Sequence, residues 1–148
     1  MQRRDFIKGT CRICLLGAAT SALTNLAASC SPAVGKSAGS LKPVINDGKV
    51  EIPLSRFESS SIVIISPVNY NYEIAVLKTT DEKNKYRSLL LSCTHYENQL
   101  TITGNGYVCA AHGSRFDKEG NVLKGPAEHN LKTLRTEITN DSLIIYIS

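Results

Sequence analysis

The stretch Cys93-Thr-His-Tyr-Glu-Asn-Gln-Leu-Thr-Ile-Thr-Gly-Asn-Gly-Tyr-Val-Cys-Ala-Ala-His-Gly-Ser-Arg-Phe-Asp117 carries the strongest evidence about the fold of this chain. It contains two short segments, Cys93-Thr94-His95 and Cys109-Ala110-Ala111-His112, and thirteen residues separate them. Each segment supplies one thiol and one imidazole. Two thiolates can hold one iron of a two-iron, two-sulfide cluster while two imidazoles hold the other. The donor set therefore predicts a centre for one-electron chemistry.

The spacing within each segment suits a compact cluster with two metal ions. In an extended stretch, residues i and i+2 face the same way, so Cys93 and His95 can reach different irons. Cys109 and His112 can do the same, because their additional intervening residue permits a turn. Between the two segments, Thr103-Gly-Asn-Gly-Tyr107 is typical of a hairpin that brings them together.

Zinc is the alternative that this donor set leaves open. Four Cys and His ligands would also satisfy a tetrahedral zinc ion in a non-redox binding module. Zinc fingers usually pair like ligands, C-x-x-C with H-x-x-x-H, whereas each segment here mixes one of each kind. The mixed pairing favours the iron–sulfur interpretation.

The surrounding residues closely resemble the Rieske family of iron–sulfur proteins. The resemblance covers roughly residues 50 to 148 and rests on Cys109-Ala-Ala-His-Gly-Ser-Arg-Phe-Asp117, Gly120 and Gly125-Pro126-Ala127. It implies a Rieske-type 2Fe-2S cluster, with Cys93 and Cys109 on an inner iron and His95 and His112 on an outer, more exposed iron. It also implies that Ser114 donates a hydrogen bond to a bridging sulfide. The loop containing Pro126 is similar to the family's proline loop, which covers the cluster.

Four residues depart from the pattern of the respiratory members of that family. Asn98 and Ala111 stand where those members have cysteines joined by a disulfide, and Phe116 stands where they have an aromatic hydroxyl. Glu97 replaces a glycine and adds negative charge. The spacing between the two segments is also about three residues shorter than is common in those members. Charge and hydrogen bonding tune such centres, so we expect a midpoint potential below that of quinol-oxidising Rieske proteins and above that of plant-type ferredoxins.

The rest of the body predicts a domain built of short strands. Apolar or alternating runs bounded by turn residues occupy residues 49–54, 61–66, 74–77, 86–91, 100–103, 106–108, 131–138 and 142–148. This pattern predicts an all-β sandwich or barrel. The family resemblance implies stacked antiparallel sheets with a cluster-binding tip built of loops, formed by a Rieske iron–sulfur domain over residues 41–148. His129 is interpreted as a surface residue.

Composition limits the classes of function. The chain has 148 residues and a formal net charge of +4, which suits one domain and a leader. Residues 1–29 carry +3 of that charge, and the remainder has 13 basic and 12 acidic residues. With a near-neutral body, no Trp and only 6% aromatic residues, nucleic-acid binding is not expected.

Residues 1–29 have the layout of a cleaved export signal. Arg3-Arg4-Asp-Phe-Ile-Lys8 precedes a mildly apolar run and resembles a twin-arginine signal, whose pathway exports folded proteins. The run is diluted by polar residues and is short for a membrane span. Leu26-Ala-Ala-Ser-Cys30 resembles a lipoprotein cleavage box, which would make Cys30 a lipidated anchor at a membrane surface. Residues 30–40 are rich in small residues and are interpreted as a flexible tether.

These features together predict an exported electron carrier, periplasmic or on the outer face of a membrane. The chain supplies no nucleophile, substrate pocket or second cofactor, so catalysis would belong to a redox partner protein, such as a cytochrome or a quinol-oxidising complex. The alternatives are the iron–sulfur subunit of a quinol-oxidising complex and the small subunit of a periplasmic molybdenum oxidase. A ferredoxin that feeds a ring-hydroxylating dioxygenase is disfavoured, because such ferredoxins work in the cytoplasm.

Overall fold

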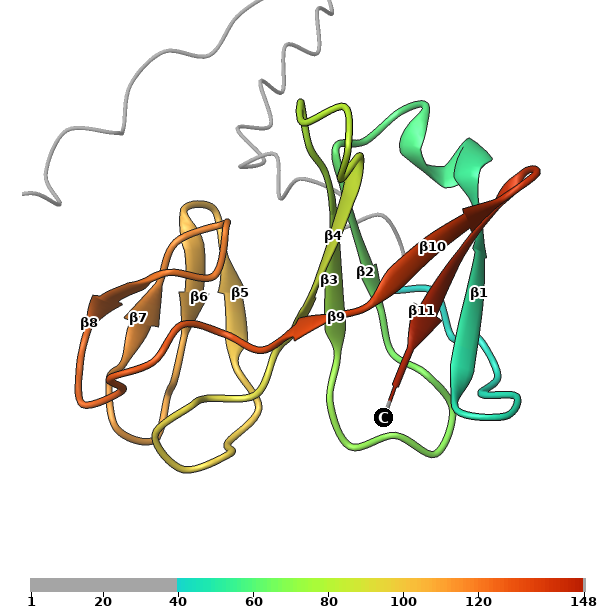
Figure 1. Ribbon diagram of the computed structural model, residues 1–148. Helices are drawn as coiled ribbons and strands as arrows, with labels where there is room; N and C mark the ends of the chain where they lie inside the picture. The colour runs from blue at the N-terminus through green and yellow to red at the C-terminus, as the bar shows by residue number, and fades with distance from the viewer. Residues whose placement is uncertain (1–39, 148) are drawn as a thin grey trace, which may run out of the picture. The chain divides into compact units, whose positions relative to one another are not determined.

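The computed structural model describes residues 40–147, which form eleven β-strands and one short 3₁₀ helix (Figure 1). The strands are β1 (Lys49–Pro53), β2 (Ile62–Ile65), β3 (Ile74–Lys78), β4 (Tyr86–Leu90), β5 (Thr101–Thr103), β6 (Gly106–Val108), β7 (Arg115–Phe116), β8 (Val122–Lys124), β9 (Thr133–Leu134), β10 (Thr136–Thr139) and β11 (Ser142–Tyr146). The helix, η1, spans Leu54–Phe57. The all-β class expected from the sequence is confirmed. In this part of the chain, no helix is long and apolar enough to cross a membrane.

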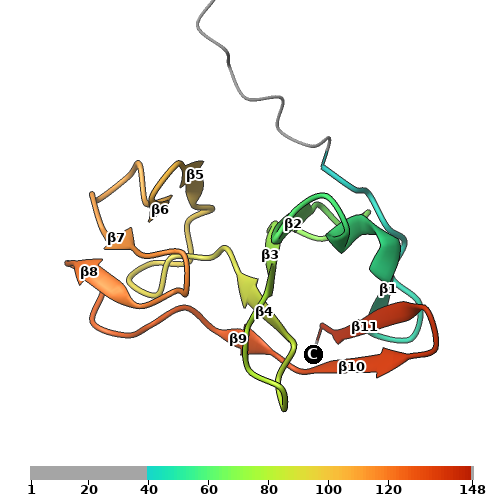
Figure 2. The same cartoon turned by 90° about the horizontal axis from the view of Figure 1, so that it is seen from above.

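The strands form three antiparallel sheets, which lie side by side when seen from above (Figure 2). A three-stranded sheet has the order β1-β11-β10, the middle sheet has the order β2-β3-β4-β9, and the third has the order β5-β6-β7-β8. The leader over residues 1–29, Cys30 and the tether as far as residue 39 lie outside the described residues.

The middle sheet is covered on both faces, and strand β3 shows this most clearly. Ile74 and Val76 belong to the core shared with the three-stranded sheet, whereas Ala75 and Leu77 belong to the core shared with the third sheet. Alternate residues of a strand point to opposite faces, so a strand buried on both sides needs a continuous apolar run. The run Ile74-Ala-Val-Leu77 is therefore explained by the two cores rather than by a single sandwich.

The third sheet belongs to a lobe, residues 91–132, inserted between two strands that pair with each other. Strand β4 pairs with β9 through Ser88 opposite Leu134 and Leu89 opposite Thr133. The chain leaves the middle sheet after β4 and returns to it at β9. The β4–β9 pair therefore holds both ends of the lobe, which begins after β4 and ends before β9.

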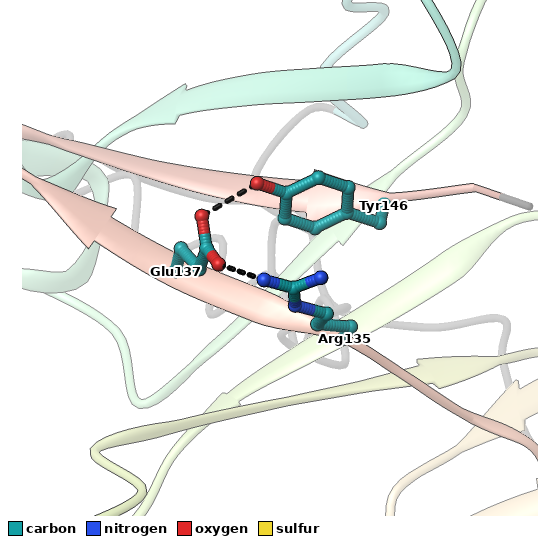
Figure 3. Close-up of polar contacts among 3 residues, drawn as sticks. All are labelled: Arg135, Glu137 and Tyr146. Carbon is teal, nitrogen blue, oxygen red and sulfur yellow. Dashed lines mark hydrogen bonds and ion pairs between the residues drawn. The ribbon is translucent and has the colours of Figure 1, made fainter.

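The expected strand over residues 131–138 is instead two strands that belong to different sheets. The chain changes sheet at Arg135, between β9 and β10, where this side chain forms an ion pair with Glu137 (Figure 3). Glu137 also accepts a hydrogen bond from the hydroxyl of Tyr146. That bond, followed by the Arg135 contact, holds the pKa of Glu137 below its ordinary value. The sequence run is continuous, but residues before Arg135 pair with β4 and residues after it pair with β11.

Strands β7 and β8 were not expected from the sequence, because each is too short to show a pattern. Their register shifts between Arg115 and Phe116, and a tight approach precedes them. A Cβ added to Gly106, whose φ is 144°, would lie 2.1 Å from the carbonyl oxygen of Phe116. Only glycine permits β6 and β7 to lie so close. The expected hairpin turn over residues 103–107 is confirmed, since Thr103 pairs with Gly106.

Candidate functional site

Three loops meet at one end of the lobe, which we call the tip. They are residues 91–100, which precede β5, residues 109–114 between β6 and β7, and residues 125–130, which follow β8. The hairpin pairing of Thr101 with Val108, and of Arg115 with Lys124, requires these connections to leave the third sheet at the same end. Figure 1 shows the first two below the third sheet. The two Cys/His segments predicted from the sequence are thus brought together.

The two segments have the same backbone hydrogen bonds. The amide of Cys93 donates to the carbonyl oxygen of Asn98 at 2.8 Å, and the amide of Cys109 donates to that of Ser114 at 2.9 Å. The carbonyl oxygen of Cys93 accepts from the amide of Glu97 at 2.7 Å, and that of Cys109 accepts from Gly113 at 2.9 Å. Each cysteine therefore opens a closed turn, and the two turns are equivalent in spite of their different Cys–His spacing.

The thiols and the imidazoles lie in different environments. Cys93 and Cys109 are both 0% exposed, are free thiols and contact each other. His95 and His112 are exposed, and their ring centroids are 5.0 Å apart with the planes at 80°. The donors thus form one buried pair of sulfur ligands and one exposed pair of nitrogen ligands. In residues 40–147, no group of three or more Cys, His, Asp or Glu side chains has the arrangement of a metal-ion site.

The environment of Cys93 favours its thiolate. Burial opposes the negative charge, but hydrogen bonds from the backbone of His95 and from the side chains of Cys109 and Ser114 outweigh it. The pKa of Cys93 is therefore lowered below its ordinary value. The thiolate is the form of cysteine that binds metals.

Ser114 joins the second segment to the loop that contains Pro126. Its side chain is 0% exposed, and its hydroxyl oxygen accepts a 3.0 Å hydrogen bond from the amide of Ala127. Accepting this bond leaves the hydroxyl proton available, and the same side chain is hydrogen-bonded to the sulfur of Cys93. Pro126 itself is exposed at the tip.

The first segment is joined to the same loop by a bond that the sequence did not predict. The hydroxyl of Thr94 donates a 2.6 Å hydrogen bond to the carbonyl oxygen of His129. The side chain of His129 is exposed, as expected of a surface residue, but its backbone fixes the loop. Residues 125–130 are thus attached to both Cys/His segments. The only signal in the sequence was the position of Thr94 between two candidate ligands.

The departures from the respiratory pattern have defined places. Phe116 is 1% exposed and lies in the same apolar core as Cys93 and Cys109. The buried Tyr107 lies in this core too, but its hydroxyl donates to the carbonyl oxygen of Lys118 at 3.3 Å. Glu97 has a φ of 50°, a left-handed conformation that glycine adopts without steric cost.

A second feature missed from the sequence is the side chain of Tyr96. It is 74% exposed, and its ring lies beside both imidazoles, with centroids 5.9 Å from His95 and 6.2 Å from His112. Its place next to His95 was the only sequence signal, and the contact with His112 comes from the fold.

Comparisons with known proteins agree with this geometry. Residues 66–135 match the model of the Rieske [2Fe-2S] domain family. The cytochrome b6-f complex iron-sulfur subunit of Synechococcus elongatus is 29% identical over 73 residues, which cover 48% of this chain and 41% of that subunit. The mitochondrial cytochrome b-c1 complex subunit Rieske of Aotus azarae is 48% identical over 67 residues, which cover 43% of this chain and 24% of that subunit.

Among solved structures, the cyanobacterial plasma membrane Rieske protein PetC3 from Synechocystis PCC 6803 matches with a TM-score of 0.48 and 21% identity, over 63% of this chain and 93% of that chain. The matched region spans less than half the length of either complex subunit. Residues 66–135 of this chain belong to the Rieske [2Fe-2S] domain family, whose cofactor is a Rieske-type 2Fe-2S cluster.

Proposed function

We propose that Cys93, Cys109, His95 and His112 hold the cluster and that the chain transfers single electrons through it. The observation that carries this proposal is the separation of the donors into a buried thiol pair and an exposed imidazole pair. One iron of a Rieske centre takes two thiolates and the other takes two imidazoles. The donor chemistry of the tip fits that group. A single tetrahedral zinc ion would instead draw the four donors around one point.

The chain's own residues divide the work between the two sides of the site. When bound, the cluster supplies a one-electron couple. The apolar core around Cys93 and Cys109 excludes water from the sulfur side. His95 and His112 reach solvent, which gives a redox partner a short path to the centre and leaves an imidazole nitrogen that can hold or release a proton. Ser114 is placed to donate its hydroxyl proton toward sulfur, and the loop with Pro126 shields the same side.

The test is the metal content and spectrum of the purified full chain. We expect two irons and two sulfides per chain and a reduced-state electron paramagnetic resonance (EPR) signal of the Rieske type. Cys93→Ser and His112→Gln are expected to lose both. His129→Gln, which changes the histidine assigned to the surface, is the matched control and is expected to keep both. Zinc in place of iron, or a Rieske signal that survives His112→Gln, would contradict the assignment.

We further propose that the redox partner lies outside the cytoplasm and that Cys30 anchors the protein at a membrane surface. The relatives named above are subunits of cytochrome b6-f and b-c1 complexes, which supports a partner within a membrane redox complex. The twin-arginine-like leader over residues 1–29 and the lipoprotein-like box before Cys30 support export and anchoring. A tether over residues 30–40 would then let the domain move between donor and acceptor. The alternatives are service in a quinol-oxidising complex or beside a periplasmic molybdenum oxidase.

Two measurements separate these possibilities. Mass spectrometry of the mature N-terminus is expected to find a lipidated Cys30, and an unmodified peptide beginning there would remove the anchor. Co-purification of the tagged full chain from detergent-solubilised membranes is expected to recover a cytochrome. Recovery of a molybdenum enzyme would favour the second alternative.

A further inference from the structure

The ring of Tyr96 lies beside both imidazoles, which also contact each other. Tyr96 belongs to the loop over residues 91–100, and so does His95, whereas His112 belongs to the loop over residues 109–114. The three ring centroids form a triangle with sides of 5.0, 5.9 and 6.2 Å. The planes of Tyr96 and His112 are tilted by 59°, and those of Tyr96 and His95 by 52°. These separations and tilts are those of attractive aromatic pairs.

The backbone gives the two loops little direct connection at this side. The hydrogen bonds of Cys93 to Asn98 and Glu97 stay within the first loop, and those of Cys109 stay within the second. Both cysteines are free thiols, so no disulfide joins the loops within residues 40–147. The bonds from Thr94 and to Ser114 lead to a third loop, residues 125–130, rather than from one Cys/His segment to the other. At the exposed side of the tip, the two loops are therefore connected through contacts among the rings of His95, Tyr96 and His112.

The exposure of Tyr96 argues against a role in the core. Its side chain is 74% exposed, whereas the apolar residues of the lobe core are at most 7% exposed. Because most of the ring of Tyr96 remains in solvent, its burial contributes little to the stability of the domain. What it contacts are two imidazoles, one from each loop.

We propose that Tyr96 is a positioning residue that clamps His95 and His112 in the geometry needed to bind the outer iron. This inference rests on the proposed function of the two histidines. The ring restricts rotation of both imidazoles and holds the two loops at a fixed separation without a covalent bond. Loss of the ring leaves the ligands in place but less ordered, so iron dissociates sooner and the electronic structure of the centre changes.

The experiment compares Tyr96→Phe, Tyr96→Leu and Tyr96→Ala in the full, cluster-loaded chain. Cluster loss is followed by the visible absorbance in excess EDTA, and the reduced state is examined by EPR. A pair of aromatic rings contributes roughly 0.5–1.5 kcal/mol, so removing the clamp should speed cluster loss by a factor of about 2 to 13. We expect this for Tyr96→Leu and Tyr96→Ala, together with broadened or shifted EPR g values. Tyr96→Phe keeps the ring and should match the parent chain.

Tyr72→Leu is the matched control. Tyr72 forms a ring pair with Tyr70 at the same centroid distance of 6.2 Å, but no imidazole takes part in that pair. The control should lose its cluster at the parent rate with unchanged g values. Parent-like behaviour of Tyr96→Ala in both measurements would overturn the proposal, and so would a Tyr96→Phe variant as labile as Tyr96→Ala, since the hydroxyl would then be responsible. A parent chain that binds no cluster would instead refute the proposed function.

Discussion

Glu97 and Gly113 occupy equivalent positions in the two turns that Cys93 and Cys109 open. Each donates its amide to the carbonyl oxygen of the cysteine four residues earlier, and each has a positive φ, 50° for Glu97 and 80° for Gly113. A left-handed conformation costs a residue with a Cβ about 1–2 kcal/mol of steric energy, whereas glycine adopts it at no comparable cost. The replacement of the family's glycine by Glu97 is therefore a strained substitution beside the candidate ligands as well as an added charge.

Glu97→Gly is expected to raise both stability and midpoint potential. Relief of the left-handed strain, less the greater backbone entropy that glycine loses on folding, should stabilise the fold by about 0.5–1 kcal/mol. Removal of a carboxylate near the centre should raise the potential, because the reduced cluster carries more negative charge. Chemical denaturation and protein-film voltammetry measure the two effects. Glu97→Gln should raise the potential without the gain in stability, and equal stability of the two variants would contradict the strain argument.

Ser114→Ala is expected to lower the midpoint potential and to destabilise the tip. The amide of Ala127 would lose its acceptor, and an unsatisfied buried donor costs about 1–3 kcal/mol. The potential should fall because a hydroxyl next to the sulfurs no longer stabilises the reduced state. Voltammetry and denaturant titration would measure both changes.

Ser88→Ala is the matched control for Ser114. Ser88 is also 0% exposed, but it lies in β4 of the middle sheet, and its hydroxyl has no hydrogen-bond partner within residues 40–147. Removing an unpaired buried hydroxyl should leave stability unchanged or raise it by about 1 kcal/mol. Its potential should equal that of the parent chain. A shift as large as that of Ser114→Ala would show that the effect is not local to the tip.

Thr94→Val is expected to release the loop over residues 125–130 from the first Cys/His segment. The change keeps the shape of the side chain but removes the donor to the carbonyl oxygen of His129, a bond worth about 1 kcal/mol. Hydrogen–deuterium exchange of the amides in residues 125–130 should become severalfold faster, while exchange in β3 stays the same. Thr94→Ser retains the hydroxyl and should exchange like the parent chain. Unchanged exchange in Thr94→Val would show that the bond to His129 does not hold the loop.

Phe116→Tyr is expected to raise the midpoint potential, because Phe116 shares a core with Cys93 and Cys109 and a new hydroxyl there can donate toward sulfur. Tyr107→Phe is the control, since the Tyr107 hydroxyl is already directed to Lys118 rather than to the cysteines. Voltammetry should show an increase for the first variant and no change for the second. A potential near the top of the Rieske range in the parent chain would refute the expectation of a moderate potential.

Tyr107 should also give the fold a specific sensitivity to alkaline conditions. Burial, followed by repulsion from Glu119 and Asp117, raises the pKa of Tyr107 from 10.0 to about 12. The folded chain therefore holds this proton more tightly than the unfolded chain, so the contribution of Tyr107 is complete below pH 10 and is lost as the pH rises to about 12. Denaturant titrations across that range should show a smaller decline for Tyr107→Phe than for the parent chain. An identical decline would mean that other groups, such as Tyr70 and Tyr146, account for it.

The sequence by itself determined the ligand candidates, the family and the all-β class. Each of these depends on short-range spacing: Cys93 with His95, Cys109 with His112, alternating apolar residues, and the turn over residues 103–107. Such patterns lie within a few residues and reflect backbone geometry, so they can be recognised without a fold. The place of the middle sheet between two cores, and the division of residues 131–138 at Arg135, did not follow from them.

The family resemblance had already implied inner cysteines and outer, more exposed histidines, but only the tertiary structure decided what holds these donors. Three contacts join separate loops at the tip. They are the bond of Thr94 to His129, the bond of Ser114 to Ala127, and the ring contact of Tyr96 with His112. Such contacts exist because the strands of the third sheet pair in one register and bring three loops to one end. The turn over residues 103–107 fixes the β5–β6 register locally, whereas the pairing of β6 with β7 and of β7 with β8 spans longer connections between strands too short to show a pattern.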